Sequence, residues 1–381
     1  MHPTPLTQDE LRAWLRLSLT DGVGNDAARR LLAAFGSPQA VFAQSEAALR
    51  QVVTAKQALA LLTDPNELAV QCVRTQQWLA HQPDTHGHAV WTLGDAHYPA
   101  ALLQLPDPPL MVYAQGKLEA TLGPAVAIVG SRNPTPQGAQ TAAQFGEALA
   151  AAGLCVVSGL ALGVDGAAHL GALRGARSRE TTDHWHTVAV VGTGLDRVYP
   201  RQHQTLAYDI AQHGLMLSEY HLGTAPLPAN FPKRNRLIAA LGLGTLVVEA
   251  ALQSGSLITA RLALDLGREV LAIPGSIHAT QSHGCHALIR QGAKLVEKAQ
   301  DVLEELQLQE QTLLFDESPP DDATTEPTLL GHMGYGPVSL DALQARCGIA
   351  TASLQAQLLT LELDGLIGRL PGGLFQRLGQ A

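Results

Sequence analysis

The sequence predicts an α/β protein with a doubly wound, mainly parallel sheet at its centre. Short apolar runs recur at residues 125–129, 154–157, 187–191, 215–218, 245–249 and 269–273. Segments with helical spacing of apolar residues separate these runs, an alternation that is typical of parallel sheets covered by helices. Glycine-rich turns follow several runs, where Rossmann-like sheets form ligand crevices. We therefore expect a Rossmann-like domain over residues 123–310.

Residues 1–80 are expected to form a small helical domain. The segments LRAWLRLSL and DAARRLLAAF carry apolar residues at three- and four-residue spacing. The turn DGVGN at residues 21–25 lies between them and is similar to the turn of a helix-hairpin-helix or SAM-like domain, where a helix N-terminus can meet a phosphate. An ordinary connection between two helices is the alternative.

Two segments are expected to connect domains. Residues 81–122 are rich in proline and glycine, which predicts an extended connector leading into the Rossmann-like domain. Residues 311–327 are acidic and contain proline, the usual composition of a flexible linker.

The last segment, residues 328–381, has the order of elements of a winged helix. Two amphipathic helices are expected at 339–347 and 351–364, followed by a hairpin over 366–378 with Gly372 and Gly373 in its turn. The second helix has almost no basic residues, whereas a helix that reads DNA normally presents arginine, lysine or asparagine. A role in DNA contact, protein contact or structure alone stays open.

Composition favours a cytoplasmic protein without a membrane segment. Apolar residues make up 46% and charged residues 15%, with no apolar run long enough to span a bilayer. The N-terminus lacks the zones of a secretory signal. The four cysteines are scattered without a CxxC pair, which indicates neither a disulfide framework nor a zinc ribbon. They are Cys72, Cys155, Cys285 and Cys347.

The net charge of −9 argues against a polyanion as partner, but the basic residues are concentrated locally. Lys233, Arg234 and Arg236 lie in a segment, residues 224–245, that contains no acidic residue. With Phe231 beside them, these cations suit phosphate neutralisation combined with base stacking. A solvated helix start is the alternative interpretation.

Further turns compatible with phosphate follow the other predicted strands. The dinucleotide fingerprint GxGxxG is absent and no acidic residue ends the second strand, so NAD is disfavoured and no cofactor is expected. Several such turns on one sheet edge exceed the needs of a mononucleotide and suit an extended single strand of DNA. Besides the cluster around Phe231, which includes Asn235, the candidate residues are Gly130, Ser131, Arg132, Ser158, Gly159, Arg197, Arg201, Ser254, Gly255 and Ser256.

Two side-chain groups invite other chemistry. Asp165 and His169 have the spacing of an acid–base pair, but at i, i+4 on one helix they can instead cap and brace the loop before it. A cluster of His278, His283, Cys285 and His286 suggests zinc, yet its spacing matches no standard site, so no metal is expected.

Several motifs in order resemble the DNA-processing protein A family, DprA or Smf. They are GSR, SGLALGVDGAAH, VVGTGLDRVYP, FPKRNRLIA, VVEAALQSGSLITA, REVLAIPG and GCHALIRQGA, and they span about residues 90–305. The resemblance implies a protein without established catalysis that binds incoming single-stranded DNA in natural transformation and helps to load the RecA recombinase. It also implies a homodimer through the Rossmann-like domain.

The same resemblance implies DNA-contacting roles for single residues of this sequence. The arginine of GSR is Arg132, the basic residue after the YP turn is Arg201, and those of FPKRNR are Lys233, Arg234 and Arg236. At His286 the family commonly has asparagine, which puts the hydrogen bonding of that loop in question.

The alternative hypothesis is a nucleotide-processing enzyme. Phosphoribohydrolases of the lysine-decarboxylase-like type use a related sheet with a PGGxGTxxE run and a glutamate near the sheet edge. The segment GLGTLVVE at 242–249 matches that run in part and makes Glu249 the candidate acid. We expect no enzymatic activity, because the turns and cations of this edge suit an extended strand.

Overall fold

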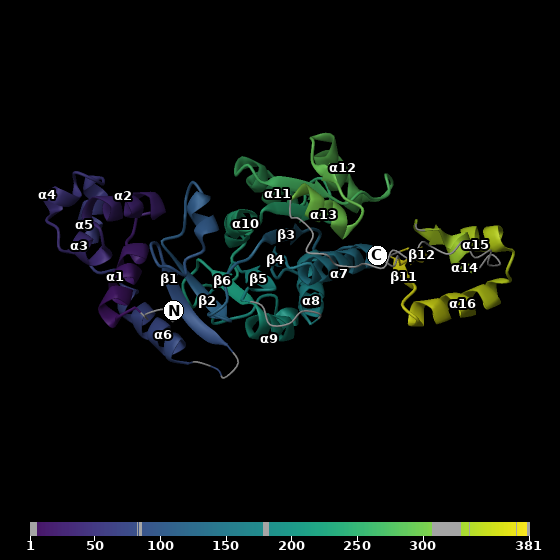
Figure 1. Cartoon of the computed structure of the whole chain (residues 1–381), viewed down its shortest axis with the longest axis horizontal. Helices are drawn as coiled ribbons and strands as arrows, with labels where there is room; N and C mark the ends of the chain where they lie inside the picture. Colours follow the sequence, from purple (N-terminus) through teal and green to yellow (C-terminus); the bar gives the residue numbers. More distant parts are fainter. Residues whose placement is uncertain are drawn as a thin grey trace.

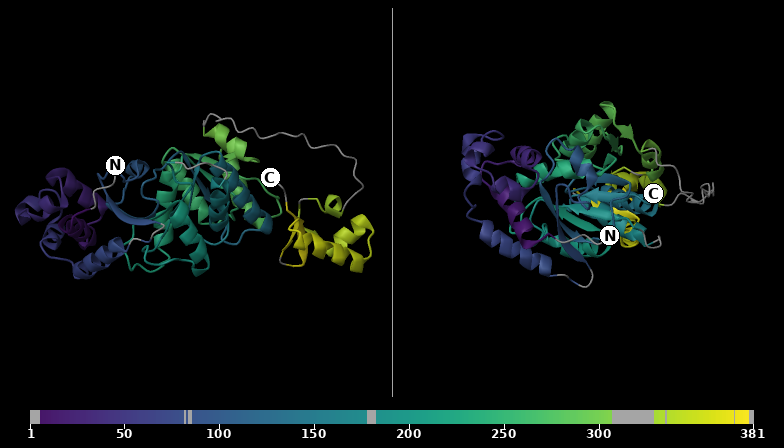
Figure 2. Two further views of the ribbon diagram at one scale, coloured as in Figure 1. Left: turned by 60° about the horizontal axis from the view of Figure 1, so that its bottom comes forward. Right: turned by 60° about the vertical axis from the view of Figure 1, so that its left-hand side comes forward.

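A central sheet lies between two smaller helical parts in the computed structural model of the chain (Figures 1 and 2). The structure describes residues 6–81, 83, 86–177, 183–306, 329–334, 336–370 and 372–378. The N-terminal helices and the C-terminal module lie at opposite ends of the molecule, with the sheet and its helices between them.

The central sheet has nine strands in the order β1-β2-β6-β5-β4-β3-β7-β8-β9. The strands β3 to β9 pair in parallel, so the α/β prediction is confirmed. Six of them lie where the apolar runs predicted strands: β3 (Ala125–Val129), β4 (Cys155–Ser158), β5 (Thr187–Val190), β6 (Leu215–Ser218), β7 (Gly244–Val247) and β8 (Glu269–Ala272). The short β9 (Lys294–Leu295) completes that edge.

The strand order reverses at β3. The chain moves from β3 outward through β4 and β5 to β6, then crosses to the other side of β3 to form β7. Such a switch point leaves a crevice at the carboxyl ends of the two strands. The turns after β3 and β7 therefore lie side by side.

Residues 81–122 were expected to be a connector, and this expectation was wrong for much of the segment. They form β1 (Gly87–Thr92) and β2 (Met111–Gly116), which pair antiparallel, and β2 pairs antiparallel with β6. Prolines 106, 108 and 109 fall between the strands, where their missing N–H groups interrupt no ladder. The segment thus extends the sheet.

Helices cover both faces of the sheet. On one face lie α10 (Asn230–Leu241), α11 (Ser256–Asp265) and α12 (His283–Arg290), and on the other α7 (Pro136–Ala151), α8 (Val164–Ala176), α9 (Gln204–His213) and α13 (Ala299–Glu305). The contact of α7 with α8 is close, since a Cβ atom at Gly171 would lie 1.9 Å from the carbonyl oxygen of Ala143. Only glycine fits there.

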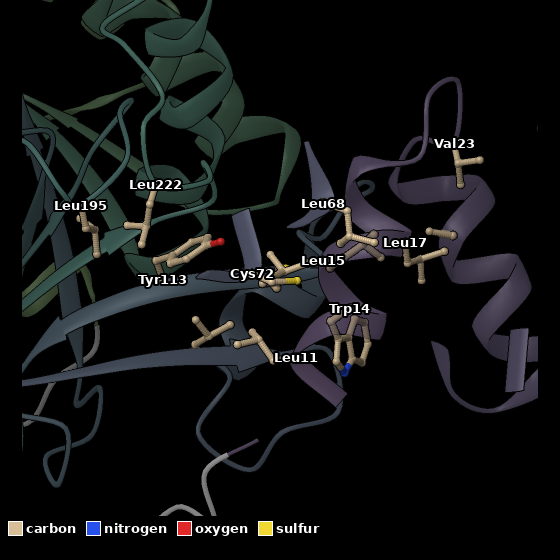
Figure 3. Packing of buried hydrophobic residues seen from close by; sticks show 14 of the residues in the cluster. Leu11, Trp14, Leu15, Leu17, Val23, Leu68, Cys72, Tyr113, Leu195 and Leu222 are labelled. Atoms are coloured by element: carbon tan, nitrogen blue, oxygen red, sulfur yellow. The ribbon is translucent and has the colours of Figure 1, made fainter. Parts of the chain in front are cut away.

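The N-terminal helices share a hydrophobic core with the edge of the sheet (Figure 3). Leu15 and Cys72 of these helices belong to one buried cluster with Tyr113 of β2 and with Leu195 and Leu222 of the loops beyond β5 and β6. The helical part is therefore anchored on the sheet. Its helices are α1 (Gln8–Leu19), α2 (Asn25–Phe35), α3 (Pro38–Phe42), α4 (Glu46–Leu49), α5 (Ala55–Leu61) and α6 (Leu68–Ala80).

The C-terminal module has a hydrophobic core of its own. Its elements are α14 (Leu329–Met333), β10 (Val338–Ser339), α15 (Leu340–Cys347), α16 (Thr351–Leu363), β11 (Ile367–Leu370) and β12 (Leu374–Arg377), with strand order β10-β12-β11. The predicted helix pair and hairpin are confirmed. Gly372 and Gly373 both have positive φ, 85° and 74°, as a tight hairpin turn requires.

Candidate nucleic-acid interface

The predicted site residues come together because their strands run parallel. The turns after β3, β4, β5, β6 and β7 all leave the carboxyl edge of the sheet. The start of α10 returns to the same edge, since Asn230 donates from its side chain to the carbonyl oxygen of Gly192, which follows β5, at 3.0 Å. Segments distant in sequence thus form one surface.

The exposed Arg132 and Tyr199 form the centre of this surface together with the half-buried Phe231. The guanidinium carbon of Arg132 lies 5.6 Å from the centroid of the Phe231 ring. The centroids of the Tyr199 and Phe231 rings lie 5.6 Å apart, and the two rings are tilted by 35° against each other. Arg132 is exposed, and Tyr199 is 48% exposed. A cation and two aromatic rings are therefore available to a ligand.

The turn that carries Arg132 is held tightly from below. Ser131 donates its backbone N–H to the carbonyl oxygen of Glu249 at 2.7 Å, which fixes the β3 turn on the β7 turn. A Cβ atom at Gly130 would lie 2.7 Å from a methyl group of Val164, so glycine is needed for this approach. Gly130 and Ser131 thus position Arg132 at the surface.

The basic segment of α10 divides into three environments. Lys233 points to solvent with 52% of its side chain exposed. Arg236 is 13% exposed and forms an ion pair with Glu219, whose carboxylate also lies 3.9 Å from the Lys233 ammonium. Glu219 follows β6 and supplies the counter-charge that the segment itself lacks. The expected contact of Arg236 with DNA is therefore revised, because this guanidinium is already paired.

Arg234 is buried beneath the surface at 3% exposure. Its guanidinium donates to the carbonyl oxygen of Gly159 at 2.7 Å and to that of Val190. These carbonyls end β4 and β5, so Arg234 ties two strands together. The expectation that Arg234 contacts DNA is corrected to a role in support of the site.

Ser158 and Gly159 are also buried, contrary to their expected contact with DNA. Ser158 donates its hydroxyl to the carbonyl oxygen of Ile128 at 2.6 Å. Gly159 leaves room for Arg234, since a Cβ atom there would lie 2.5 Å from a guanidinium nitrogen. Both residues therefore support the carboxyl edge of the sheet from its buried side. Asn235, one residue beyond Arg234 on α10, is half-buried.

The serine turn after β7 lies at the start of α11. The hydroxyls of Ser254 and Ser256 are 2.6 Å apart, and Ser256 donates its N–H to the Ser254 hydroxyl at 3.3 Å. The helix cap is Gly255, which is exposed and has no neighbour within 4 Å of its Cβ position, whereas Ser256 is buried, contrary to its expected contact with DNA. The turn leaves an open approach to the backbone of Gly255.

Glu249 occupies the N-terminus of α7. Its carboxylate accepts the N–H of Thr135 at 2.9 Å and the Thr135 hydroxyl at 2.6 Å. A Cβ atom at Gly138 would lie 2.3 Å from the carboxylate carbon, so the glycine makes room for it. Burial raises the pKa of Glu249. The helix end at which a Rossmann-like sheet binds phosphate is thus filled by a carboxyl group of the chain itself.

Asp165 braces the β4 turn, whereas His169 contacts the start of β5. The Asp165 carboxylate accepts the N–H groups of Gly159 at 3.2 Å and Ala161 at 3.3 Å. His169 is fully buried, and its Nδ1 lies 2.7 Å from the Thr187 hydroxyl on β5. These contacts support the bracing interpretation for Asp165, while His169 connects α8 to β5.

The buried His169 predicts a loss of stability in acid. Burial lowers its pKa to about 3, from about 6.5 in an unfolded chain. Below pH ~6.5 this histidine is protonated in the unfolded state but stays neutral in the folded state. The contribution of His169 to the free energy of unfolding is therefore complete above that pH and is lost as the pH falls toward 3. The stability difference between wild type and His169→Gln should shrink by about 1.4 kcal/mol per pH unit over that range. Urea unfolding at pH 7.5 and pH 5 measures it, and a constant difference would contradict it.

The histidines near α12 hold a loop. His286 Nε2 lies 3.0 Å from the Gly275 carbonyl oxygen, and His283 Nε2 lies 3.0 Å from that of Ile277. At position 286 histidine therefore provides the hydrogen bond to this loop.

Within the described ranges, no three His, Cys, Asp or Glu side chains are grouped as a metal site requires. Over the same ranges, no helix has the length and apolar character to cross a bilayer.

Known proteins share both the central and the C-terminal parts of this chain. A family described as DNA recombination-mediator protein A matches residues 89–307, and the DprA winged helix domain matches residues 315–373. This chain belongs to the DprA family. Protein Smf of Escherichia coli (strain K12) is 40% identical over 304 residues, which cover 78% of this chain and 78% of that protein. DNA processing protein DprA of Streptococcus pneumoniae is 45% identical over 213 residues, 56% of this chain and 72% of that protein.

Two solved DprA structures resemble the present one. The X-ray structure of DprA from Streptococcus pneumoniae is 34% identical and has a TM-score of 0.63, covering 79% of this chain and 99% of its own. A DprA structure from Helicobacter pylori is 31% identical with a TM-score of 0.50, covering 58% of this chain and 95% of its own. That study describes the single-stranded DNA binding mode of the Helicobacter protein. The central fold is therefore that of DprA proteins.

Sequence reasoning missed several residues of this surface. Glu219 was overlooked because it lies 14 residues before Lys233 in the chain and reaches the cations only through the fold. Tyr199 was quoted in a motif but not considered as a stacking ring. The burial of Arg234 had a signal, since it shares helical spacing i, i+3, i+4 and i+7 with the buried Leu237, Ile238 and Leu241.

Proposed function

We propose that this protein binds single-stranded DNA along the carboxyl edge of its sheet and helps to load RecA recombinase on that strand in natural transformation. In this proposal it acts in the cytoplasm as a homodimer formed through the Rossmann-like domain, and without catalysis. The Helicobacter relative, which binds single-stranded DNA, supports the choice of ligand.

The observation that carries the proposal is the contact of the exposed Arg132 with the half-buried Phe231, with Lys233 two residues beyond on α10. A ring can stack on an unpaired base, while the cations meet the phosphates on either side of it. In a duplex the bases are stacked on one another and offer no free face to Phe231. The arrangement therefore favours a single strand over a duplex.

Fluorescence anisotropy tests the proposal with a labelled single strand and a duplex of equal length. The single strand is expected to bind more tightly, and its affinity is expected to fall with salt. If Arg132, Lys233, Arg197 and Arg201 each neutralise one phosphate, the slope of log K against log salt should be about −3. Equal binding of both nucleic acids, or a slope near zero, would argue against the proposal.

The RecA and dimer parts of the proposal need their own measurements. The rate at which RecA forms filaments on a DNA strand should rise when this protein is present. A variant with reduced DNA affinity should not raise that rate. Light scattering should give twice the mass of one 40.2 kDa chain. A single-chain mass at the concentration of the binding assay would reject the homodimer while leaving DNA binding intact.

The enzyme hypothesis has one structural feature in its favour. Glu249 lines a cavity of about 350 Å³ and burial raises its pKa, as a general acid requires. Its two contacts with Thr135, however, support a capping role at α7. Incubation with nucleoside monophosphates distinguishes the catalytic role of Glu249 from the capping role. Release of the free base by wild type, and its loss in Glu249→Gln, would establish an enzyme.

A further inference from the structure

A second surface of suitable chemistry begins where the first one ends. The loop of residues 195–201, together with β2 and α9, encloses an open groove of about 800 Å³. Its polar and aromatic lining consists of Gln115, Asp196, Arg197, Arg201, Gln204, Thr205 and Tyr208. The proposed DNA surface accounts for the two arginines but not for the groove or its tyrosine.

Tyr199 connects this groove with the Arg132 surface. Its ring contacts Phe231 at 5.6 Å, while Val198 and Arg201, its neighbours in the chain, line the groove. The ring is 48% exposed, so it forms part of the surface between the two regions. A strand that stacks on Phe231 and passes over Tyr199 would arrive at Arg201.

The charge of the groove suits a phosphate backbone. Arg201 and Arg197 are both exposed. Asp196, the acidic residue of the lining, accepts the N–H of Gly223 at 2.7 Å and pairs with Arg197 at 3.3 Å. Because its carboxylate is engaged on two sides, its repulsion of a phosphate is reduced. Arg201 is the stronger anchor, since Arg197 shares its charge with Asp196.

Tyr208 offers a stacking ring inside the groove. It lies on α9 and is 51% exposed, a large fraction for an aromatic side chain. Its ring meets that of His86 in a T-shaped contact at 6.1 Å, which restrains its orientation. An exposed aromatic ring beside two arginines repeats the chemistry of Phe231 beside Arg132.

We propose that the bound single strand continues past Tyr199 into this groove, where Arg201 and Arg197 meet its phosphates and a base stacks on Tyr208. This inference rests on the proposed function and extends it. It makes the binding surface longer than the Phe231 site alone, so affinity should depend on the length of the strand.

Oligonucleotides of two lengths test the groove. A strand of about four nucleotides fills one stacking site, whereas a strand of about 16 can reach both. Tyr208→Ala is expected to weaken binding of the long strand by about 5- to 100-fold and to leave the short strand unchanged. Tyr208→Phe, which keeps the ring, should bind both strands as wild type does. Arg201→Ala should lower the salt slope for the long strand by about 0.7.

The outcomes separate this inference from the proposed function. Phe231→Ala should weaken both lengths, which locates the short strand at the first site. Unchanged affinity of Tyr208→Ala for the long strand, or an equal loss on both strands, overturns the groove while DNA binding at Phe231 stands. If wild-type protein binds neither length, the proposed function itself fails.

Discussion

Alanine at both Arg132 and Lys233 is expected to weaken binding of single-stranded DNA by about 100-fold or more. Each side chain is exposed, and a charge-assisted contact contributes about 1.5–3 kcal/mol, or roughly tenfold or more in affinity. Loss of Arg132 also removes the cation beside the Phe231 ring. Anisotropy across a salt series measures the change, and the salt slope should fall by about 1.4 for the two phosphates.

Two matched cations serve as controls for this double variant. Arg177 follows α8 at the edge of the sheet opposite the site, because α8 begins at the carboxyl end of β4 and runs back. Lys56 is exposed on α5 of the N-terminal helices. Alanine at both should change affinity by less than about twofold. If the control and the site variant lose affinity equally, binding depends on total charge and not on this surface.

Replacing Arg234 by alanine is expected to lower the free energy of unfolding by about 3–5 kcal/mol. The change leaves the carbonyl oxygens of Gly159 and Val190 without their donor inside the protein. It also removes the buried positive charge next to Asp165, whose carboxylate is held at the same turn. Burial lowers the pKa of Arg234 only to about 10, so the guanidinium is charged at neutral pH. Urea unfolding followed by circular dichroism gives the difference.

Two further variants provide the comparison for Arg234→Ala. Arg197→Ala removes an exposed side chain and should change stability by less than about 0.5 kcal/mol. Arg234→Lys keeps the charge but places it on a shorter side chain without the planar guanidinium, so an intermediate loss is expected. A midpoint for Arg234→Ala equal to that of wild type would mean that the residue supports nothing in the fold.

The six central strands could be predicted because each is buried on both faces and appears as an unbroken apolar run. β1 and β2 could not be predicted in the same way. They flank a loop that contains three prolines within residues 106–109, and this composition dominated the segment. Their place in the sheet depends on pairing with β6, about 100 residues further along the chain. β9 is too short to leave a pattern.

The edge of the sheet at which the candidate residues meet was predictable from the sequence. Which of these residues face solvent and which are buried or paired was not. Turns after parallel strands must meet at one edge, which brought Arg132, Arg201 and Lys233 to the same surface. Whether a cation faces solvent or the sheet depends on its neighbours in space. Arg234 donates to two backbone carbonyls and Arg236 is paired with Glu219, and none of these partners is near them in sequence.

The carboxylate of Glu249 occupies the start of α7, so it competes with the phosphates of free nucleotides for this helix end. The carboxyl group is covalently part of the chain and already accepts two hydrogen bonds from Thr135. ATP and other mononucleotides would have to displace a group that is covalently part of the chain. A polymer that spreads its contacts over several turns has no need of that position. We therefore expect mononucleotides to bind weakly at this helix end, while the proposed binding of single-stranded DNA does not depend on it.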